Sequence, residues 1–248
     1  MTGAYGWRAR IGHVYPAVVA ESFMCEFYRI VPPGVTLAQT HLVIQSLNER
    51  EGLETSIKMI EQAAEYLAKR KVDVITIGGS PMFRLMGIGS DKVIIERLEK
   101  KFGIPVTTNQ TASVAAFNSL GVKKIAVASP YFDHQNEQVK KFLEGSGFDV
   151  VNIKGLSQEV EVIHELPLEA SYHHARKVFF ETPEAEAVYI PCAHFAVPWL
   201  QDLENDLRVP VVSSTAAVIW HSLKILNIRA PILRHGRLLA SLSETKAT

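Results

Sequence analysis

One supersecondary pattern occurs twice in this chain of 248 residues. The segments "GIPVTTNQTASVAAFNSL", from Gly103, and "RVPVVSSTAAVIWHSL", from Arg208, each join a short apolar run, a Ser/Thr/Asn cap and a helical pattern. "KVDVITIGGS" (71–80) and "AEAVYIPCAH" (185–194) also match, and their strand ends at Gly79 and Cys192 lie 113 positions apart. "RIGHVYPAVVAESF" (10–23) and "KIAVASPYFDHQNE" (124–137) are offset by a similar spacing. Such a duplication predicts two similar structural units.

Short apolar runs alternate with amphipathic stretches along the chain, and the runs lack strict polar–apolar alternation. Runs of this kind, separated by helices, predict parallel sheets covered on both faces. We therefore predict an α/β fold with two pseudo-symmetric lobes, each a parallel sheet of about four strands flanked by helices. The active site is expected in the cleft between them. The first lobe is predicted to span residues 1–109 and 214–248, and the second residues 110–213. The predicted strands are Ile11–Tyr15, Thr36–Gln39, Val72–Ile77, Val106–Thr108, Lys124–Ala128, Asp149–Ile153, Ala187–Pro191 and Val209–Val212.

Composition excludes several classes of function. Lys plus Arg and Asp plus Glu number 26 each, so the chain has no net charge to attract nucleic acid or an anionic membrane. No apolar stretch reaches bilayer length, and the first residues lack the apolar core of a signal peptide, so we expect a cytoplasmic protein. No CxxC or HExxH occurs, and "GIGSDK" (87–92) fits neither the dinucleotide fingerprint nor the phosphate loop. The sequence thus shows no sign of a metal, nucleotide or flavin cofactor.

Cys192 follows the apolar run "VYIP" and is the strongest candidate for chemistry. Ligands of parallel α/β lobes bind beyond the carboxyl ends of the strands, so we predict this thiol in the cleft wall. We expect a helix to follow it, with Pro198 near the start, and the positive end of that helix would tune the thiol pKa. A thiol there can transfer protons to and from carbon. The alternative is a small buried hydrophobe, which we favour for Cys25.

Other candidates lie at neighbouring strand ends. Gly79 is the repeat partner of the thiol and offers nothing that titrates, although a tight turn alone would also explain a glycine. Ser80 could bind a carboxylate or cap a helix. Tyr131 could reach an oxyanion with its phenol, or serve in packing. The backbone N–H groups of Ala193 and His194 are candidate oxyanion donors, and the His194 ring could also share a proton.

Six segments together resemble the Asp/Glu racemase superfamily, in the branch that holds arylmalonate decarboxylase and maleate cis-trans isomerase. They are "RIGHVYP", "VITIGGSPMF", "GIPVTT", "GVKKIAVASPYFDHQNEQVKKFL", "AVYIPCAH" and "VPVVSSTAAVIWHSL". The resemblance implies a cofactor-free site between two α/β lobes. Racemases and maleate isomerases of this group carry a cysteine in each lobe, whereas the decarboxylase keeps only the second and has glycine at the first position. Gly79 and Cys192 fit the decarboxylase pattern. The residues at its oxyanion-pocket positions are Ser80, Tyr131, Ala193 and His194.

The chain also departs from the family pattern. Pro81 stands where the decarboxylase has a second hydroxyl residue, so a side-chain donor and a backbone N–H are both lost. Ala193 and His194 replace two glycines, which narrows the pocket. The isomerases have a substrate-binding Asn in the first loop, where this chain has Val18 and Val19. That difference argues against maleate as the substrate.

We therefore expect a cofactor-independent decarboxylase of disubstituted malonate-type acids, in which Cys192 protonates an enediolate from one face. One alternative is an isomerase or racemase in which His194 or another group replaces the missing thiol. Another is a non-catalytic carboxylate-binding protein. The expected partner is a small carboxylic acid, and the oligomeric state, monomer or small homo-oligomer, stays open. The predicted substrate pocket is formed by Val14, Tyr15, Pro16, Val18, Met82 and Phe83.

Overall fold

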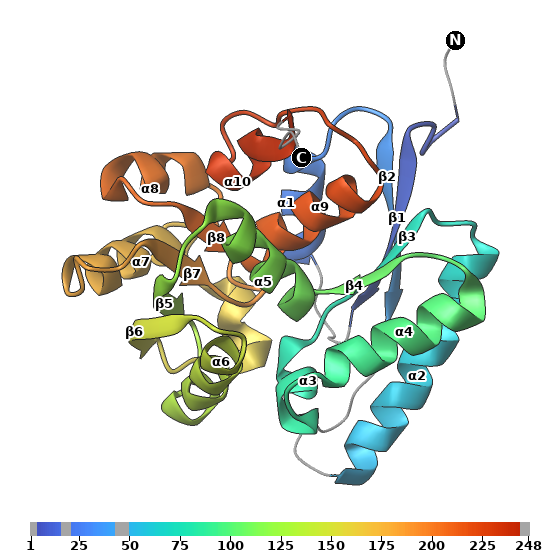
Figure 1. Ribbon diagram of the computed structural model, residues 1–248, viewed down its shortest axis with the longest axis horizontal. Helices are drawn as coiled ribbons and strands as arrows, with labels where there is room; N and C mark the ends of the chain where they lie inside the picture. The colour runs from blue at the N-terminus through green and yellow to red at the C-terminus, as the bar shows by residue number, and fades with distance from the viewer. Residues whose placement is uncertain (1–3, 16–20, 43–49, 244–248) are drawn as a thin grey trace.

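The computed structural model describes residues 4–15, 21–42 and 50–243 of the chain. It contains two four-stranded parallel sheets, with strand orders β2-β1-β3-β4 and β6-β5-β7-β8. Figure 1 shows the two sheets in separate lobes that lie side by side, each flanked by its own helices. The predicted fold class is confirmed. The assignment of the chain termini to one lobe or the other stays a prediction.

The first lobe is built on β1 to β4, which alternate with helices along the chain. Its strands are β1 (Ala9–Tyr15), β2 (Val35–His41), β3 (Val74–Ile77) and β4 (Val106–Thr108). Its helices are α1 (Glu21–Ile30), α2 (Arg50–Lys69), α3 (Ser80–Met86) and α4 (Ser90–Phe102). Every residue of β3 and β4 is buried, as expected for parallel strands that are covered on both faces.

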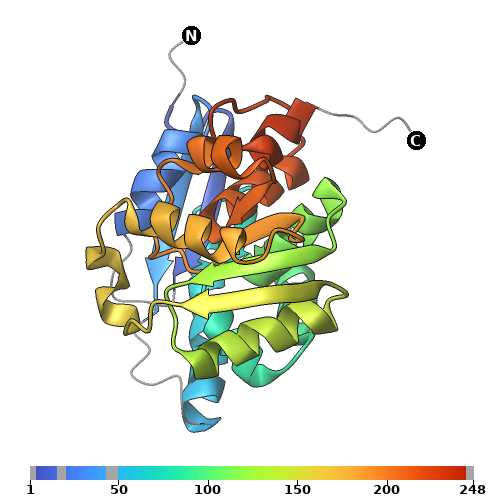
Figure 2. The ribbon, with the colours of Figure 1, turned by 90° about the vertical axis from the view of Figure 1, so that its left-hand side faces the viewer.

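The second lobe repeats this arrangement. Its strands are β5 (Lys124–Ser129), β6 (Asp149–Gly155), β7 (Ala187–Ile190) and β8 (Val211–Ser213). Figure 2 shows β5 and β6 as neighbouring arrows that point the same way. The remaining helices are α5 (Asn109–Leu120), α6 (Asp133–Gly145), η1 (Val160–Glu165), α7 (Ala170–Phe180), α8 (Leu200–Leu207), α9 (Ser214–Ile225), α10 (Arg237–Ala240) and η2 (Ser241–Ser243).

The strand orders confirm the sequence duplication, because β1, β3 and β4 take the same places in the first sheet as β5, β7 and β8 in the second. The helix caps are duplicated as well. The Thr108 hydroxyl accepts the N–H of Thr111 at the start of α5, and the Ser213 hydroxyl accepts the N–H of Ala216 at the start of α9. All eight predicted strands are present, with ends that agree to within two residues.

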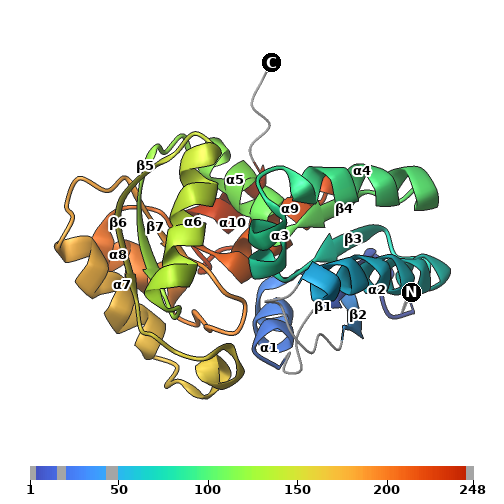
Figure 3. The ribbon, with the colours of Figure 1, turned by 90° about the horizontal axis from the view of Figure 1, so that it is seen from below.

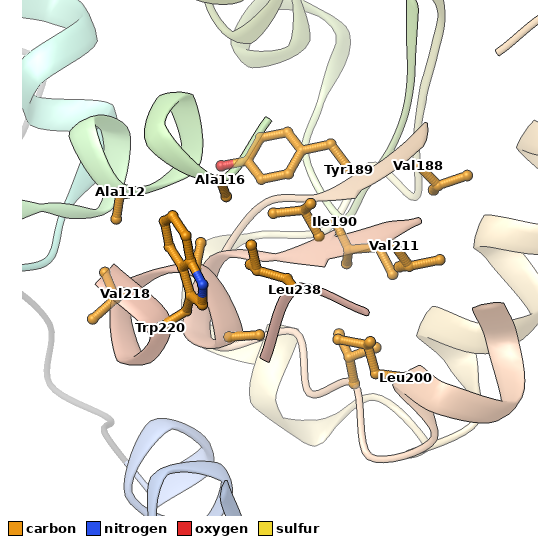
Figure 4. Close-up of a cluster of buried hydrophobic side chains, with 14 of the residues drawn as sticks. Ala112, Ala116, Val188, Tyr189, Ile190, Leu200, Val211, Val218, Trp220 and Leu238 are labelled. Atoms are coloured by element: carbon orange, nitrogen blue, oxygen red, sulfur yellow. The ribbon is translucent and has the colours of Figure 1, made fainter. Parts of the chain in front are cut away.

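Helices α5 and α9 pack against each other where the lobes meet. Asn109 at the start of α5 donates from Nδ2 to the hydroxyl of Ser214 at the start of α9, over 3.0 Å. Figure 4 shows Trp220 of α9 and Ala116 of α5 in a buried cluster with Tyr189 of β7. Helix α9 also contacts β3 and β4 of the first sheet, so it joins the cores of both lobes. Among the described residues, no helix is both long enough and apolar enough to cross a membrane.

Candidate active site

Cys192 and Gly79 occupy equivalent turns at the ends of equivalent strands. Gly79 comes two residues after β3, with φ of 78°, and Cys192 comes two residues after β7, with φ of 83°. A left-handed backbone is favourable for glycine, whereas any other residue there stores of order 1–3 kcal/mol of strain. Cys192 as a whole residue is partly exposed, whereas its thiol group is desolvated by burial. The structure therefore holds a cysteine in a conformation made for glycine, at the carboxyl edge of the second sheet.

The helix that we predicted directly after Cys192 is absent from this part of the described chain. Pro191 to Trp199 form a turn and loop, and α8 begins only at Leu200. Pro198 does lie near the helix start, as expected, but the helix begins too late to act on the thiol. The loop places the backbone N–H groups of His194 and Phe195 next to the sulfur instead, where they favour its anionic form.

Burial dominates the protonation state of the Cys192 thiol. Desolvation raises its pKa, and this outweighs the opposing effects of the two amides, the Tyr131 hydroxyl and the Arg84 charge. The pKa of Tyr131 is also raised, chiefly by burial and then by the neighbouring sulfur. At neutral pH the site therefore contains a protonated thiol and a neutral phenol, and both groups can donate a proton or a hydrogen bond.

Residues from both lobes meet around the thiol. Figure 3 shows α3 of the first lobe facing α6 of the second, and the two helices are in contact. Helix α3 carries Ser80, which follows Gly79, while Tyr131 lies just before α6. The backbone of Tyr131 is fixed by its N–H, which donates to the Ser129 hydroxyl over 3.2 Å. The thiol and the phenol of the second lobe thus lie near helix α3 of the first lobe, which carries Ser80, and this placement supports the predicted active site between the lobes.

Arg84 belongs to this cluster and was missed by our sequence analysis. Its guanidinium carbon lies 5.6 Å from the centre of the Tyr131 ring, and its charge acts on the Cys192 thiol. A signal was present, because Arg84 follows Ser80 by one helical turn in α3 and so shares its face. The single cation in the otherwise apolar sequence "PMFRLM", on the same helix face as Ser80, indicates a second polar group at the site.

The loop of Cys192 is tied to helix α1 of the first lobe. The Ser22 hydroxyl donates to the Ala193 carbonyl over 3.0 Å, and the Glu26 carboxylate accepts the backbone N–H of Val197. Ser22 and Glu26 are four positions apart, so they lie on one face of α1. This pair fixes the loop that carries the thiol with respect to both lobes. The sequence offered no sign of it, because the bonds join residues 171 positions apart.

His194 faces the first lobe, with its ring centre 5.5 Å from that of Tyr15. Burial lowers its pKa to about 4, so the ring is neutral at pH 7. Its ring also lines a cavity of about 200 Å³ between α1 and the segment 163–168. A role for His194 as the second proton-transfer group stays a prediction.

The predicted pocket residues fall into two groups. Val14, Met82 and Phe83 have no exposed surface and pack in the core of the first lobe. Tyr15 is 2% exposed and packs between the rings of His13 and His194. Pro16 and Val18 lie outside the described residues. Direct contact of these side chains with a substrate stays a prediction.

The sequence profile of the arylmalonate decarboxylase family matches residues 24–239. The chain belongs to the arylmalonate decarboxylase family. Arylmalonate decarboxylase of Bordetella bronchiseptica is 24% identical over 177 residues, which cover 71% of this chain and 74% of that protein. Maleate isomerase of Geobacillus stearothermophilus is 26% identical over 140 residues, which cover 55% of each chain. The relatives of this chain thus include enzymes of two reaction classes.

Solved structures share the fold of this member of the arylmalonate decarboxylase family. A crystal structure of arylmalonate decarboxylase superposes with a TM-score of 0.80 at 22% identity, covering 93% of this chain and 98% of that one. The maleate cis-trans isomerase of Nocardia farcinica superposes with a TM-score of 0.83 at 22% identity, covering 95% and 99%. The same isomerase has been solved with a covalently bound succinylcysteine intermediate, with a TM-score of 0.84 at 20% identity and coverage of 96% and 99%.

Glu26, which anchors the loop of Cys192, leads to a prediction about how the stability of the fold depends on pH. Burial raises its folded-state pKa from 4.5 to about 7. Between these values the folded state binds a proton that the unfolded state has lost, so stability falls as the pH rises through this window. Glu26→Gln removes the ionisation, and the variant should gain roughly 3 kcal/mol over the wild type between pH 4 and pH 8.

Urea unfolding of both proteins at the two pH values measures this difference. Glu96→Gln, on the exposed face of α4, is the matched control and should show no comparable gain. A Glu26→Gln variant whose stability follows the wild type at both pH values would show that Glu26 ionises normally in the fold.

Proposed function

We propose that this chain is a cofactor-independent decarboxylase of disubstituted malonate-type acids, with Cys192 as the proton donor to carbon. The observation that carries this proposal is the asymmetry of two equivalent turns, because one holds a thiol with a raised pKa and the other holds Gly79. A protonated thiol suits the delivery of a proton. A glycine opposite offers no group that could remove a proton from the other face.

The proposed reaction has two steps. The bond between the α-carbon and one carboxylate breaks, CO₂ leaves, and the electron pair moves into the remaining carboxylate to form an enediolate. Cys192 then transfers its proton to the α-carbon and is reprotonated from solvent. We place the carboxylate that remains near Ser80 and Tyr131, whose hydroxyl groups can donate to the developing charge. The leaving carboxylate would lie toward the apolar end of β1, near Tyr15.

The backbone donors need a revised assignment within this proposal. The sequence favoured the amides of Ala193 and His194 for the oxyanion, but in the structure those of His194 and Phe195 face the sulfur. We therefore assign them to the thiolate that exists after proton transfer, where they stabilise the leaving base. The enediolate then depends on side-chain donors to a greater extent.

A second candidate is a proton-transfer isomerase or racemase. It is favoured by the relatives named maleate isomerase and by the succinylcysteine found in one of the similar structures. A nucleophilic cysteine works as the thiolate, whereas burial keeps the Cys192 thiol protonated. The decarboxylase therefore fits the electrostatics of this site better.

The two candidates separate in one experiment with aryl-, alkenyl- and alkylmalonates, with maleate alongside. A decarboxylase releases CO₂ from a malonate and, in D₂O, gives a single enantiomer with one deuterium at the α-carbon. Conversion of maleate to fumarate, or deuterium in both enantiomers of a chiral acid, would favour the isomerase or racemase. Saturable binding of the acids without any turnover would identify a carboxylate-binding protein and overturn the proposal.

The raised thiol pKa also predicts the pH dependence of turnover. Because Cys192 must carry its proton to act, kcat/KM should stay level through neutral pH and fall only at pH values above the ordinary thiol pKa of about 8.5. A rate profile from pH 6 to pH 11 measures the position of this limb. A limb that rises with pH between 6 and 8.5 would instead indicate a thiolate as the active form.

A further inference from the structure

Arg84 reaches from the first lobe into the cluster around the thiol. It lies in α3 one helical turn after Ser80, and α3 packs against α6 of the second lobe. The guanidinium carbon stands 5.6 Å from the Tyr131 ring centre, and its charge also acts on Cys192 and Tyr189. A permanent cation is therefore held between the two lobes, beside the Cys192 thiol and the Tyr131 phenol.

One edge of this guanidinium is buried and unused. Nε and Nη2 have no hydrogen-bond partner among the described residues, and none of the described carboxylates forms an ion pair with Arg84. The contrast with Arg97 and Arg176 is clear, because these exposed arginines pair with Glu61 and Asp206. Nε and Nη2 are the two parallel donors that grip a carboxylate in a bidentate pair. Burying them without a partner is costly, so the arrangement favours an anion that is not part of the chain.

The chemistry of decarboxylation decides which carboxylate belongs there. The leaving carboxylate loses its charge as CO₂ forms, so a cation beside it would stabilise the ground state and slow the reaction. The remaining carboxylate gains charge as the enediolate develops, so a cation beside it stabilises the transition state. The neutral donors are few in this chain, since Pro81 has no N–H and the amides after Cys192 face the sulfur.

We infer that Arg84 binds the carboxylate that remains on the substrate, through a bidentate pair with its Nε and Nη2 atoms. The inference rests on the proposed function for the choice of carboxylate, but the binding itself does not depend on turnover. It defines a substrate class, because the acid must keep a free, planar carboxylate opposite the departing one. Half-esters and half-amides, which cannot form the charged pair, are excluded as good substrates.

Alkylation of the thiol tests the binding without any catalysis. Iodoacetate carries a carboxylate and iodoacetamide does not, while both place the same methylene group on sulfur and release iodide. At Cys192, the rate with iodoacetate divided by the rate with iodoacetamide should be about tenfold or more lower in Arg84→Met than in the wild type, because a charge-assisted pair is lost. The exposed thiol of Cys25 serves as the internal reference in the same mass-spectrometric digest, and its ratio should not change.

Two further variants sharpen the result. Arg97→Met removes an exposed arginine from α4 of the same lobe and should leave both ratios unchanged. Arg84→Lys keeps the positive charge but lacks the two parallel N–H donors, so it should lose part of the preference for iodoacetate. This variant replaces Arg84→Met in the test if the methionine variant does not fold. An unchanged ratio in folded Arg84→Met and Arg84→Lys overturns the inference. An equal fall for both reagents also overturns it, since Arg84 would then act on the thiol and not on the carboxylate.

Turnover supplies a separate readout. With an active malonate, Arg84→Met should lower kcat as well as kcat/KM, because the pair strengthens in the transition state. A rise in KM alone would show uniform binding and overturn the assignment to the remaining carboxylate. If no malonate is decarboxylated by the wild type while the iodoacetate preference still depends on Arg84, the proposed function fails and the carboxylate site stands.

Discussion

Replacing Cys192 with glycine should abolish turnover while making the protein more stable than the matched Cys192→Ala variant. A general acid contributes roughly 10²–10⁴-fold to a reaction, and Gly79 opposite cannot take over its role. Residue 192 has φ of 83°, close to the 78° of Gly79. Alanine retains the strain of this backbone, whereas glycine releases it, so the glycine variant should be the more stable by about 1 kcal/mol.

Both effects are measured on the same two proteins, by CO₂ release and by denaturant unfolding. Cys25→Ala is the control for the loss of a thiol. We predicted Cys25 to be buried, which is wrong, because it is exposed on α1 and lies outside the cluster. The control variant should keep full turnover. A rate in either Cys192 variant that falls by less than about tenfold would remove the thiol from the mechanism. A glycine variant less stable than the alanine variant would show that the left-handed turn carries no strain.

Introducing a thiol at the opposite turn should give the enzyme a new reaction. In Gly79→Cys, two thiols would face the α-carbon from the two lobes, so a proton could be removed on one side and delivered on the other. We expect this variant to racemise an enantiopure α-aryl or α-alkenyl acid, which the wild type should leave unchanged. The turn already accommodates a cysteine at the equivalent position, at an expected cost of about 1–2 kcal/mol for the left-handed backbone.

Chiral chromatography of the acid over time measures the racemisation. Gly79→Ala imposes the same backbone strain without a thiol and should not racemise the acid. The double variant Gly79→Cys with Cys192→Ala has one thiol again and should also leave the acid unchanged. Racemisation by Gly79→Ala, or by the wild type at the same rate, would contradict the single-donor site.

The fold followed from the sequence because its strands carry their own signal. The strands β3 (VITI) and β7 (AVYI) consist mainly of β-branched and other apolar residues, and both are fully buried in the structure. The Ser/Thr caps before α5 and α9 are local signals of the same kind. A prediction failed where contacts between residues distant in the sequence decide the local structure. The segment after Cys192 looked like a helix start, but it folds as a turn because bonds from α1 hold its carbonyl and amide groups.

The candidate site was predictable only in part. Gly79, Ser80, Tyr131 and Cys192 all follow strand ends, so the topology alone gathers them at the junction of the lobes. Arg84 lies within a helix, and only its contact with Tyr131 of the other lobe identifies it as part of the candidate site. The pocket residues stay a prediction, since an apolar side chain near a strand end packs into the core as readily as it lines a cleft.

The bonds from Ser22 and Glu26 to the thiol loop have a consequence for stereochemistry. Cys192 follows a strand of the second sheet, but its loop is hydrogen-bonded to a helix of the first lobe. Both lobes therefore determine the face of the α-carbon to which the thiol would deliver its proton. If the two lobes moved relative to each other, the sulfur of Cys192 would therefore move with the first lobe. In the proposed reaction, α1 would therefore help to set the handedness of the product, although this helix contributes no reacting atom.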